Sequence, residues 1–446
     1  MDTPICDFVR GYAQSGALRL HMPGHKGGGP IGPEALDITE IPGADSLYEA
    51  DGIIRRSEQN AGKLFGAHTF YSAEGSSLCI RAMLALAQWH ARAQGKRARI
   101  LAGRNAHKVF LSAAALLDLD VCWITPERPD AYLSCAVGAK ALEAQLSTLN
   151  PAPVAVYLTS PDYLGQTVDL STLAEVCHRR GVLLLVDNAH GAYLRFLPKS
   201  RHPIDLGADI CCDSAHKTLP VLTGGAYLHI SLSAPAELFK QARQALALFG
   251  STSPSYLILQ SLDAANRFLA EGYGQRLAAF IGHVEQAKAE LCAHGWQTVG
   301  DEPLKLTLRT KPFGYRGTEV ADALAEAQII CEFADPDFVV MMVTPETGKQ
   351  NLDRLVYALC KMQRRRAIDE PPPALGGAQQ VLSIRQAMMA PREEVPVERC
   401  EGRVLASASI GCPPAVPIVV CGERISRSAI ACFEYYGIRR CTVVAD

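Results

Sequence analysis

Short apolar runs alternate with amphipathic stretches between residues 60 and 235, and this alternation is the feature that most constrains the fold. Residues 76–94 carry apolar side chains at helical spacing, and a second helix is expected at 169–180. Strands are expected at residues 99–102, 121–124, 154–159, 182–186 and 210–212. The run 182–186 is apolar throughout, which is typical of a strand buried on both faces. Such strands, alternating with helices, predict an α/β fold with a mostly parallel sheet.

The remaining segments suggest a division into four parts. Residues 1–45 are rich in glycine and proline, and we expect an N-terminal arm or loop there. Residues 46–290 are predicted to form the large domain, which ends in a long helical stretch. Residues 291–370 resemble a smaller α/β domain, and a C-terminal domain is expected at 375–446, after a proline-rich linker. The helical stretch, at 257–291, is expected to link the large domain to the smaller α/β domain.

Composition and charge exclude several classes of protein. The formal net charge is -2 over 446 residues, and no extended basic run favours a nucleic-acid partner. The 15 cysteines include no CxxC pair, and no Cys or His spacing indicates a metal site. The N-terminus lacks a signal-peptide pattern, and the apolar runs are too short to span a bilayer. We therefore expect a cytoplasmic protein with reduced thiols and with no metal, nucleic-acid partner or membrane association.

A lysine follows directly on one of the expected strands, in the run Ser214-Ala215-His216-Lys217. An amine at the end of a buried strand is partly desolvated, which lowers its pKa and leaves it nucleophilic towards an aldehyde. Ser214, three residues earlier, is placed to hydrogen-bond a phosphate. The alternative is a surface lysine at a strand end, and this run alone does not decide between the two.

An aspartate ends an earlier strand, in the run Asp187-Asn188-Ala189-His190. Its carboxylate could pair with a protonated pyridine nitrogen and so maintain an electron sink. An aspartate that ends a strand is more often a helix cap. The order of Asp187 and then Lys217 on consecutive sheet strands favours the cofactor interpretation, and His190 is a further candidate for contact with that cofactor.

The run Gly75-Ser76-Ser77 opens the helix expected from residue 76. The start of a helix offers free backbone N–H groups and the positive end of the helix dipole, and two hydroxyls add donors. This combination suits a phosphate, although an ordinary serine N-cap would give the same sequence.

Two further candidates come from other segments. His107 follows the strand at 99–102, where an imidazole could stack on a pyridine ring or act as an acid, although a lone histidine is usually just a satisfied polar residue. The hydroxyl-rich run 251–256 could be a capping turn. Alternatively, Ser251 and Thr252 could complete a phosphate site in a neighbouring subunit.

In their joint order, the motifs of this chain resemble the bacterial ornithine/lysine/arginine decarboxylase family, and the resemblance covers nearly the whole sequence. The motifs are His21-Met22-Pro23-Gly24-His25-Lys26, Asp37-Ile38-Thr39-Glu40, Phe65-Gly66-Ala67, Gly75-Ser76-Ser77, Arg104-Asn105-Ala106-His107-Lys108, Ser160-Pro161-Asp162-Tyr163-Leu164-Gly165, Asp187-Asn188-Ala189-His190, Ser214-Ala215-His216-Lys217, Thr252-Ser253-Pro254-Ser255-Tyr256, Glu401-Gly402-Arg403-Val404 and Pro413-Pro414-Ala415-Val416-Pro417.

The resemblance implies a fold-type-I enzyme (aspartate aminotransferase-like) that uses pyridoxal 5'-phosphate (PLP). It implies that Lys217 forms the Schiff base, Asp187 pairs with the ring nitrogen, and His107 stacks on the ring. His216 would lie beside the Schiff base and return a proton after CO2 leaves. The phosphate would be held by Gly75, Ser76, Ser77 and Ser214, with Ser251 or Thr252 from the partner subunit. A homodimer, or an oligomer built from dimers, with its active site at the interface, is therefore expected.

Two departures from the family bear on the substrate. Many relatives have Pro-Thr-Tyr-Tyr-Gly where this chain has Asp162 after Pro161, and a Pro-Gly-Glu of relatives is Cys421-Gly422-Glu423 here. Glu423 is a candidate partner for the distal cation of a substrate. We also expect a short form of the family, without the N-terminal receiver-like domain of the large inducible members.

The function that the resemblance implies is decarboxylation of arginine, lysine or ornithine to the amine and CO2, a reaction of polyamine biosynthesis. The sequence does not choose among these three substrates. An aminotransferase would use the same lysine and aspartate, and a non-catalytic relative is a further alternative.

Overall fold

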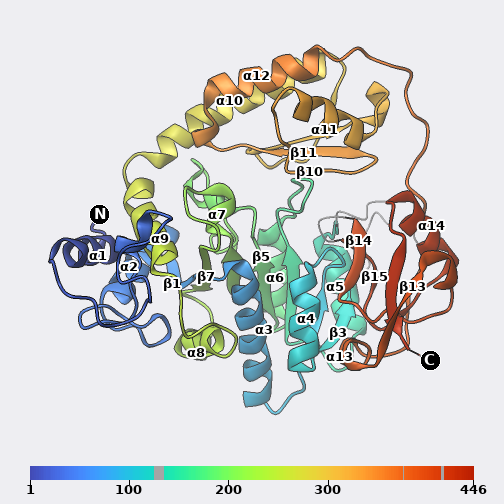
Figure 1. Cartoon of the computed structure of the whole chain (residues 1–446). Helices are drawn as coiled ribbons and strands as arrows, with labels where there is room; N and C mark the ends of the chain where they lie inside the picture. Colours follow the sequence, from blue (N-terminus) through green and yellow to red (C-terminus); the bar gives the residue numbers. More distant parts are fainter. Residues whose placement is uncertain (125–134, 375, 413–415, 446) are drawn as a thin grey trace. The chain divides into compact units, whose positions relative to one another are not determined.

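The computed structural model describes residues 1–124, 135–374, 376–412 and 416–445 (Figure 1). The chain forms two compact units, each made of two stretches: residues 1–96 with 177–276, and residues 97–176 with 277–446. The four-part division expected from the sequence remains a prediction. Pro413, Pro414 and Ala415 of the last family motif lie outside the described residues. Within the described residues, no helix combines the length and the apolar composition needed to cross a membrane.

The first unit contains four strands in the order β1 (Ala67–Ser72), β7 (Ala226–Ser231), β6 (Ile210–Asp213) and β5 (Leu183–Asp187). β5 and β6 run parallel, whereas β7 is antiparallel to both β6 and β1. Every residue of β5 and β6 is buried, as their apolar sequences lead one to expect. The register pairs Asp187 with Cys212, so these two strands end beside each other.

Helix α3 (Gly75–Ala93) packs against β6 and β7 of this unit. Its apolar side chains, among them Leu78, Met83 and Leu86, are buried, which explains the helical spacing seen in the sequence. The other helices of the unit are α1 (Pro4–Gln14), α2 (Ile53–Phe65), α7 (Ala215–Thr218), α8 (Ala236–Ala247) and α9 (Tyr256–Ala270), with 3-10 turns η1 (Pro33–Leu36), η2 (Leu47–Glu49) and η3 (Ala192–Phe196).

In the second unit, β2 (Arg99–Ala102) lies between β3 (Asp120–Trp123) and β4 (Ala155–Thr159), and all three run parallel. Helices α4 (Lys108–Leu117) and α5 (Ala139–Thr148) follow β2 and β3 along the chain. Together with the parallel pair β5–β6 of the first unit, these strands confirm the predicted α/β class with mostly parallel pairing.

The second unit also holds a four-stranded antiparallel sheet in the order β10-β11-β9-β8 and three two-stranded sheets, β12–β16, β13–β17 and β14–β15. The strands are β8 (Gln297–Val299), β9 (Lys305–Arg309), β10 (Phe333–Ala334), β11 (Phe338–Met342), β12 (Gln379–Gln380), β13 (Arg392–Pro396), β14 (Ser409–Cys412), β15 (Val416–Val420), β16 (Glu423–Arg424) and β17 (Arg440–Val444). The helices are α11 (Gly317–Glu326), α12 (Gly348–Cys360), α13 (Ile384–Met389) and α14 (Arg427–Tyr435), with 3-10 turns η4 (Lys311–Phe313), η5 (Pro345–Thr347) and η6 (Val397–Arg399). Leu405, Phe433 and Val443 belong to a separate buried core near the C-terminus.

Two helices cross a boundary between the stretches of the two units: one begins in the second unit and ends in the first, and the other begins in the first and ends in the second. The helix expected at 169–180 is α6 (Leu170–Arg179). The single helical stretch expected at 257–291 is wrong: it is divided into α9 and α10 (Tyr273–Ala293). The break falls at Gly272, whose φ of +78° lies in the left-handed region, where an α-helix of L-residues cannot continue.

Candidate active site

Lys217 lies in the short helix α7, directly after β6, and its side chain is half-buried. Its Nζ lies 3.1 Å from Nε2 of His190, which follows the neighbouring strand β5 and is buried. The amine is therefore held at the carboxyl ends of two parallel strands, where open α/β sheets bind their ligands. The sequence placed Lys217 and His190 in one site, and the structure brings them into contact.

Asp187 is the last residue of β5, and its side chain is only 2% exposed. Oδ1 accepts hydrogen bonds from the backbone N–H of Ala189 at 3.1 Å and from the thiol of Cys212 at 3.7 Å. A carboxylate buried in this way favours a cationic partner, because burial penalises charge that is not compensated. This environment suits a protonated pyridine nitrogen.

The serines predicted to hold a phosphate meet at the start of α3. The Ser214 hydroxyl donates to Oγ of Ser76 at 2.8 Å, although the two residues are 138 positions apart. Glu74, at the N-cap of α3, makes no side-chain capping bond, so no such bond occupies the N–H groups of the first turn. Ser77 is half-buried in that turn. Two hydroxyls beside the start of a 19-residue helix form a suitable cradle for a phosphate dianion.

Gly75 provides the turn into this helix. Its φ is +71°, and its N–H donates to the carbonyl of Gly224 at 2.7 Å. A Cβ at this position would lie 3.9 Å from Cε1 of His216, so the constraint on residue 75 comes from the backbone conformation and not from crowding.

His216 precedes the lysine, and its Nδ1 donates to the carbonyl of Gly225 at 2.9 Å. Burial lowers the pKa of this imidazole, and the charge of Lys217 acts in the same direction, against the raising effect of the Gly225 hydrogen bond. The neutral ring with its proton on Nδ1 leaves Nε2 as a proton acceptor.

Ser251 and Thr252 are both exposed. The N–H of Ser251 donates to Oε1 of Glu74 at 2.6 Å, so within one chain this segment lies beside the N-cap of α3. The contribution of either hydroxyl to the phosphate site of a partner subunit remains a prediction.

His107 belongs to the second unit, where it is the N-cap of α4. Its Nδ1 accepts a hydrogen bond from the N–H of Val109 at 3.3 Å, and the ring is half-buried. The predicted stacking of this ring on the cofactor remains a prediction, and capping is the role that the structure shows.

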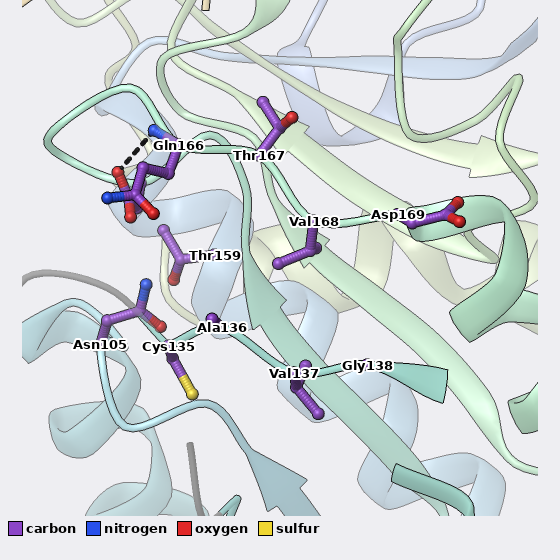
Figure 2. Close-up of a pocket in the computed structure, with 11 residues that line it drawn as sticks. Asn105, Cys135, Ala136, Val137, Gly138, Thr159, Gln166, Thr167, Val168 and Asp169 are labelled. Atoms are coloured by element: carbon purple, nitrogen blue, oxygen red, sulfur yellow. Dashed lines mark hydrogen bonds between the residues drawn. The ribbon is translucent and has the colours of Figure 1, made fainter. Parts of the chain in front are cut away.

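A polar cavity of about 200 Å³ lies in the second unit, at the carboxyl ends of β2 and β4. Figure 2 shows the side chains of Asn105, Thr159 and Gln166 around it. Asp162 also lines the cavity and is 3% exposed. Its Oδ1 accepts backbone N–H groups of Leu164 and Gln166, each at 2.9 Å, which fixes the carboxylate in the cavity wall.

The structure does not support Glu423 as the partner of a substrate cation. Its carboxylate is 2% exposed and forms a two-point ion pair with Arg104, at 2.5 Å and 2.7 Å. The backbone N–H of Val420 donates to the same carboxylate at 2.8 Å. The charge of Glu423 is therefore compensated within the second unit.

Sequence reasoning missed a buried polar cluster behind β6. Asp213 lies within hydrogen-bonding distance of His202 and His229, and Cys211 lies beside His202. A polar residue at the end of the run 210–213 was the one available signal, because the two histidines lie in other segments and follow no pattern that links them to Asp213.

Comparison with known proteins places these observations in a family. Residues 3–298 match the Orn/Lys/Arg decarboxylase major domain, and residues 375–440 match the C-terminal domain of the same family. An arginine decarboxylase of Halalkalibacterium halodurans is 30% identical over 463 aligned positions, which cover 96% of this chain and 92% of the relative.

Solved structures show the same fold. A lysine decarboxylase of Francisella novicida superposes with a TM-score of 0.80 at 17% identity, covering 99% of this chain and 81% of that chain. A structure of SPT with PLP superposes with a TM-score of 0.54 at 13% identity, covering 69% of this chain and 75% of that chain. The chain belongs to the Orn/Lys/Arg decarboxylase family, and is thus a fold-type-I enzyme that decarboxylates basic amino acids with pyridoxal phosphate as its cofactor.

Proposed function

We propose that this enzyme decarboxylates arginine to its amine and CO2, with Lys217 as the residue that joins the cofactor aldehyde. The observation that carries the catalytic part is the contact of Lys217 with His190 in the unit that also holds Asp187 and the Ser76–Ser214 pair. The choice of arginine is supported by the relative named arginine decarboxylase, which matches nearly the full chain.

When bound, PLP supplies an electron sink for the electron pair that remains on Cα when CO2 leaves. Asp187 would pair with the ring nitrogen, and Ser76, Ser77 and Ser214 would bind the phosphate. Lys217 would return as the amine that releases the product.

His216 would move the proton that replaces CO2 on Cα. Its neutral ring would first take up a proton on Nε2, and the lowered pKa of the imidazole favours release of that proton to carbon. His107 would cover the cofactor ring. A homodimer in the cytoplasm, in which Ser251 or Thr252 completes the partner's phosphate site, is part of the same proposal.

An amine-product assay on arginine, lysine and ornithine tests this function. We expect CO2 and one amine from arginine, little from the other two, and none from Lys217→Ala. Lys199→Ala, which removes an exposed lysine of the same unit, is the matched control and should retain activity. Keto-acid formation without CO2 would instead indicate an aminotransferase, and a preference for lysine or ornithine would overturn the choice of arginine.

A further inference from the structure

Asp213 is the centre of a buried hydrogen-bond network in the first unit. Its Oδ2 accepts hydrogen bonds from Nε2 of His202 at 3.0 Å and from Nε2 of His229 at 3.2 Å. Its Oδ1 accepts from the side-chain amide of Asn188 at 2.6 Å. All four side chains are 0% exposed, so Asp213 depends on these three donors to carry its charge.

The histidine contacts assign the protons. The backbone N–H of Ile204 donates to Nδ1 of His202 at 3.4 Å, so the proton of the neutral ring lies on Nε2 and points at Asp213. Nδ1 of His229 pairs with the hydroxyl of Thr69 at 2.8 Å, which leaves its Nε2–H for Asp213. Burial alone would raise the pKa of Asp213, but the interactions with both histidines outweigh it and hold this pKa well below its usual range.

The same atoms are spaced like metal ligands, because His202, Cys211 and Asp213 each offer one ligand atom within 4.8 Å of the others. A cation bound by these three residues would have to displace the Nε2 proton of His202, which already hydrogen-bonds Asp213. The hydrogen bonds already satisfy the carboxylate without a cation. We therefore interpret the cluster as a hydrogen-bond network that supports the cofactor site.

The pleat of the sheet explains how this network reaches the cofactor site. Asp187 is paired with Cys212 in the strand register and accepts a hydrogen bond from the Cys212 thiol, so these two side chains lie on one face of the sheet. Asp213 follows Cys212 and therefore points to the opposite face. Asn188 follows Asp187 and reaches Asp213 on that face, while its own N–H donates to the carbonyl of Cys212 at 3.0 Å. Neighbouring residues at the end of β5 are thus anchored on opposite faces of the sheet.

We propose that Asp213 is a positioning residue for the cofactor ring: it anchors Asn188, and the peptide between residues 187 and 188 then fixes the direction of the Asp187 carboxylate. The inference rests on the cofactor role of Asp187 within the proposed function. It assigns Asp213 to the ring and not to the phosphate, although Ser214 is its neighbour in sequence.

Binding of PLP and of pyridoxal, which lacks the phosphate, separates these two roles. The visible absorption that appears when each aldehyde joins Lys217 gives the dissociation constants without turnover. We expect Asp213→Asn and Asn188→Ala each to weaken both ligands by a similar factor, about 10-fold, because the first removes the charge that holds the Asn188 amide and the second removes the amide that bonds this charge. Ser214→Ala should weaken PLP alone.

Asp209→Asn is the matched control. Asp209 precedes the same strand β6, is buried, and accepts from His178 Nε2 at 3.0 Å and from the N–H of Leu184 at 2.7 Å. The Asp209→Asn substitution should reduce the stability of the protein without changing the dissociation constant of PLP or of pyridoxal. Asn188→Ala keeps Asp213 with both histidines, so it reports on the link even if Asp213→Asn folds poorly.

Two outcomes would overturn the proposal. Unchanged affinities in Asn188→Ala, with a loss of stability like that of Asp209→Asn, would leave Asp213 a purely structural role. A loss of PLP affinity with unchanged pyridoxal affinity would assign the network to the phosphate. Failure of the wild-type protein to release CO2 while it still binds PLP would count against the proposed function alone.

Discussion

At the scale of single residues, the phosphate cradle depends on a pair of hydroxyls that bond each other. We expect Ser76→Ala and Ser214→Ala each to weaken PLP binding about 10-fold, because each removes a donor to a dianion. In the double variant, PLP affinity should fall by less than the product of the two single-variant factors. The two hydroxyls are hydrogen-bonded at 2.8 Å, so their contributions are not independent. Spectroscopic titration of PLP measures this. Ser112→Ala, which removes a hydroxyl bonded within α4, should bind PLP normally, and full additivity of the two losses would contradict the coupling.

A second residue-scale prediction concerns the buried pair of Arg104 and Glu423. Glu423→Gln should lower the free energy of unfolding by about 3 kcal/mol, because it leaves a largely buried guanidinium without its counter-charge. Asp353→Asn breaks the exposed pair with Lys349 and should change it by less than about 1 kcal/mol. Urea unfolding of both variants gives the comparison, and equal losses would show that burial does not govern the Arg104 pair.

Some site residues could be found from the sequence because each adjoins a recognisable element. Lys217 and Asp187 follow apolar strands, and Ser76 opens a helix with clear periodicity. The partner of Glu423 could not be found, because Arg104 lies 319 positions away and no local pattern encodes such a contact. The histidines around Asp213 lie only 11 and 16 positions from it, but they belong to other segments of the chain, and no local pattern encodes their contacts either.

At the scale of secondary-structure elements, the five strands β2 to β6 were predicted to within a residue or two, and β2 has the bounds expected for it, whereas β1 and β7 were not predicted. The clearest signal came from β5, which is buried throughout and apolar up to its last residue. The break between α9 and α10 was not predictable from periodicity, because apolar spacing continues on both sides of Gly272. An isolated glycine in such a pattern is compatible with an uninterrupted helix.

Because of that break, alanine substitutions at two glycines should change the stability of the protein in opposite directions. Gly272→Ala should destabilise the protein by about 1 kcal/mol or more, because an L-residue is strained at a φ of +78°. Gly282 lies inside α10 with open space at its Cβ position, so Gly282→Ala should stabilise by up to about 1 kcal/mol through helix propensity. Thermal unfolding of both variants tests this, and a stabilising Gly272→Ala would show that the break is not fixed by that residue.

At the scale of the whole molecule, the fold class was predictable because the alternation of strands and helices extends over a large part of the chain. Which residues make up each of the two compact units was not predictable, since each unit joins stretches that are distant in sequence. Their assembly depends on side-chain packing between those stretches, which periodicity does not report.

Global stability should carry a pH dependence that originates at Glu58. Burial raises the pKa of this carboxyl to about 7, although Arg243 and the N–H of Tyr71 oppose the shift. Between about pH 4.5 and pH 7 the folded protein therefore keeps a proton that the unfolded chain releases, so this group lowers the free energy of unfolding as pH rises.

Glu58→Gln removes that titration. The unfolding free energy of the variant minus that of the wild type should increase by more than about 1.4 kcal/mol, the equivalent of one pKa unit, between pH 4.5 and pH 7. Denaturant unfolding at several pH values measures the difference, in which the other carboxyls cancel. A constant difference across this range would show that Glu58 titrates normally.

The network around Asp213 also has a consequence for how relatives of this enzyme can diverge. Replacing any one of Asn188, His202, Asp213 and His229 strands a donor or an acceptor in the dry interior, so isolated changes should be selected against. Through descent these four positions are therefore expected to be inherited, or exchanged, as a set, and a lineage that has lost the aspartate should have lost its imidazole neighbours with it.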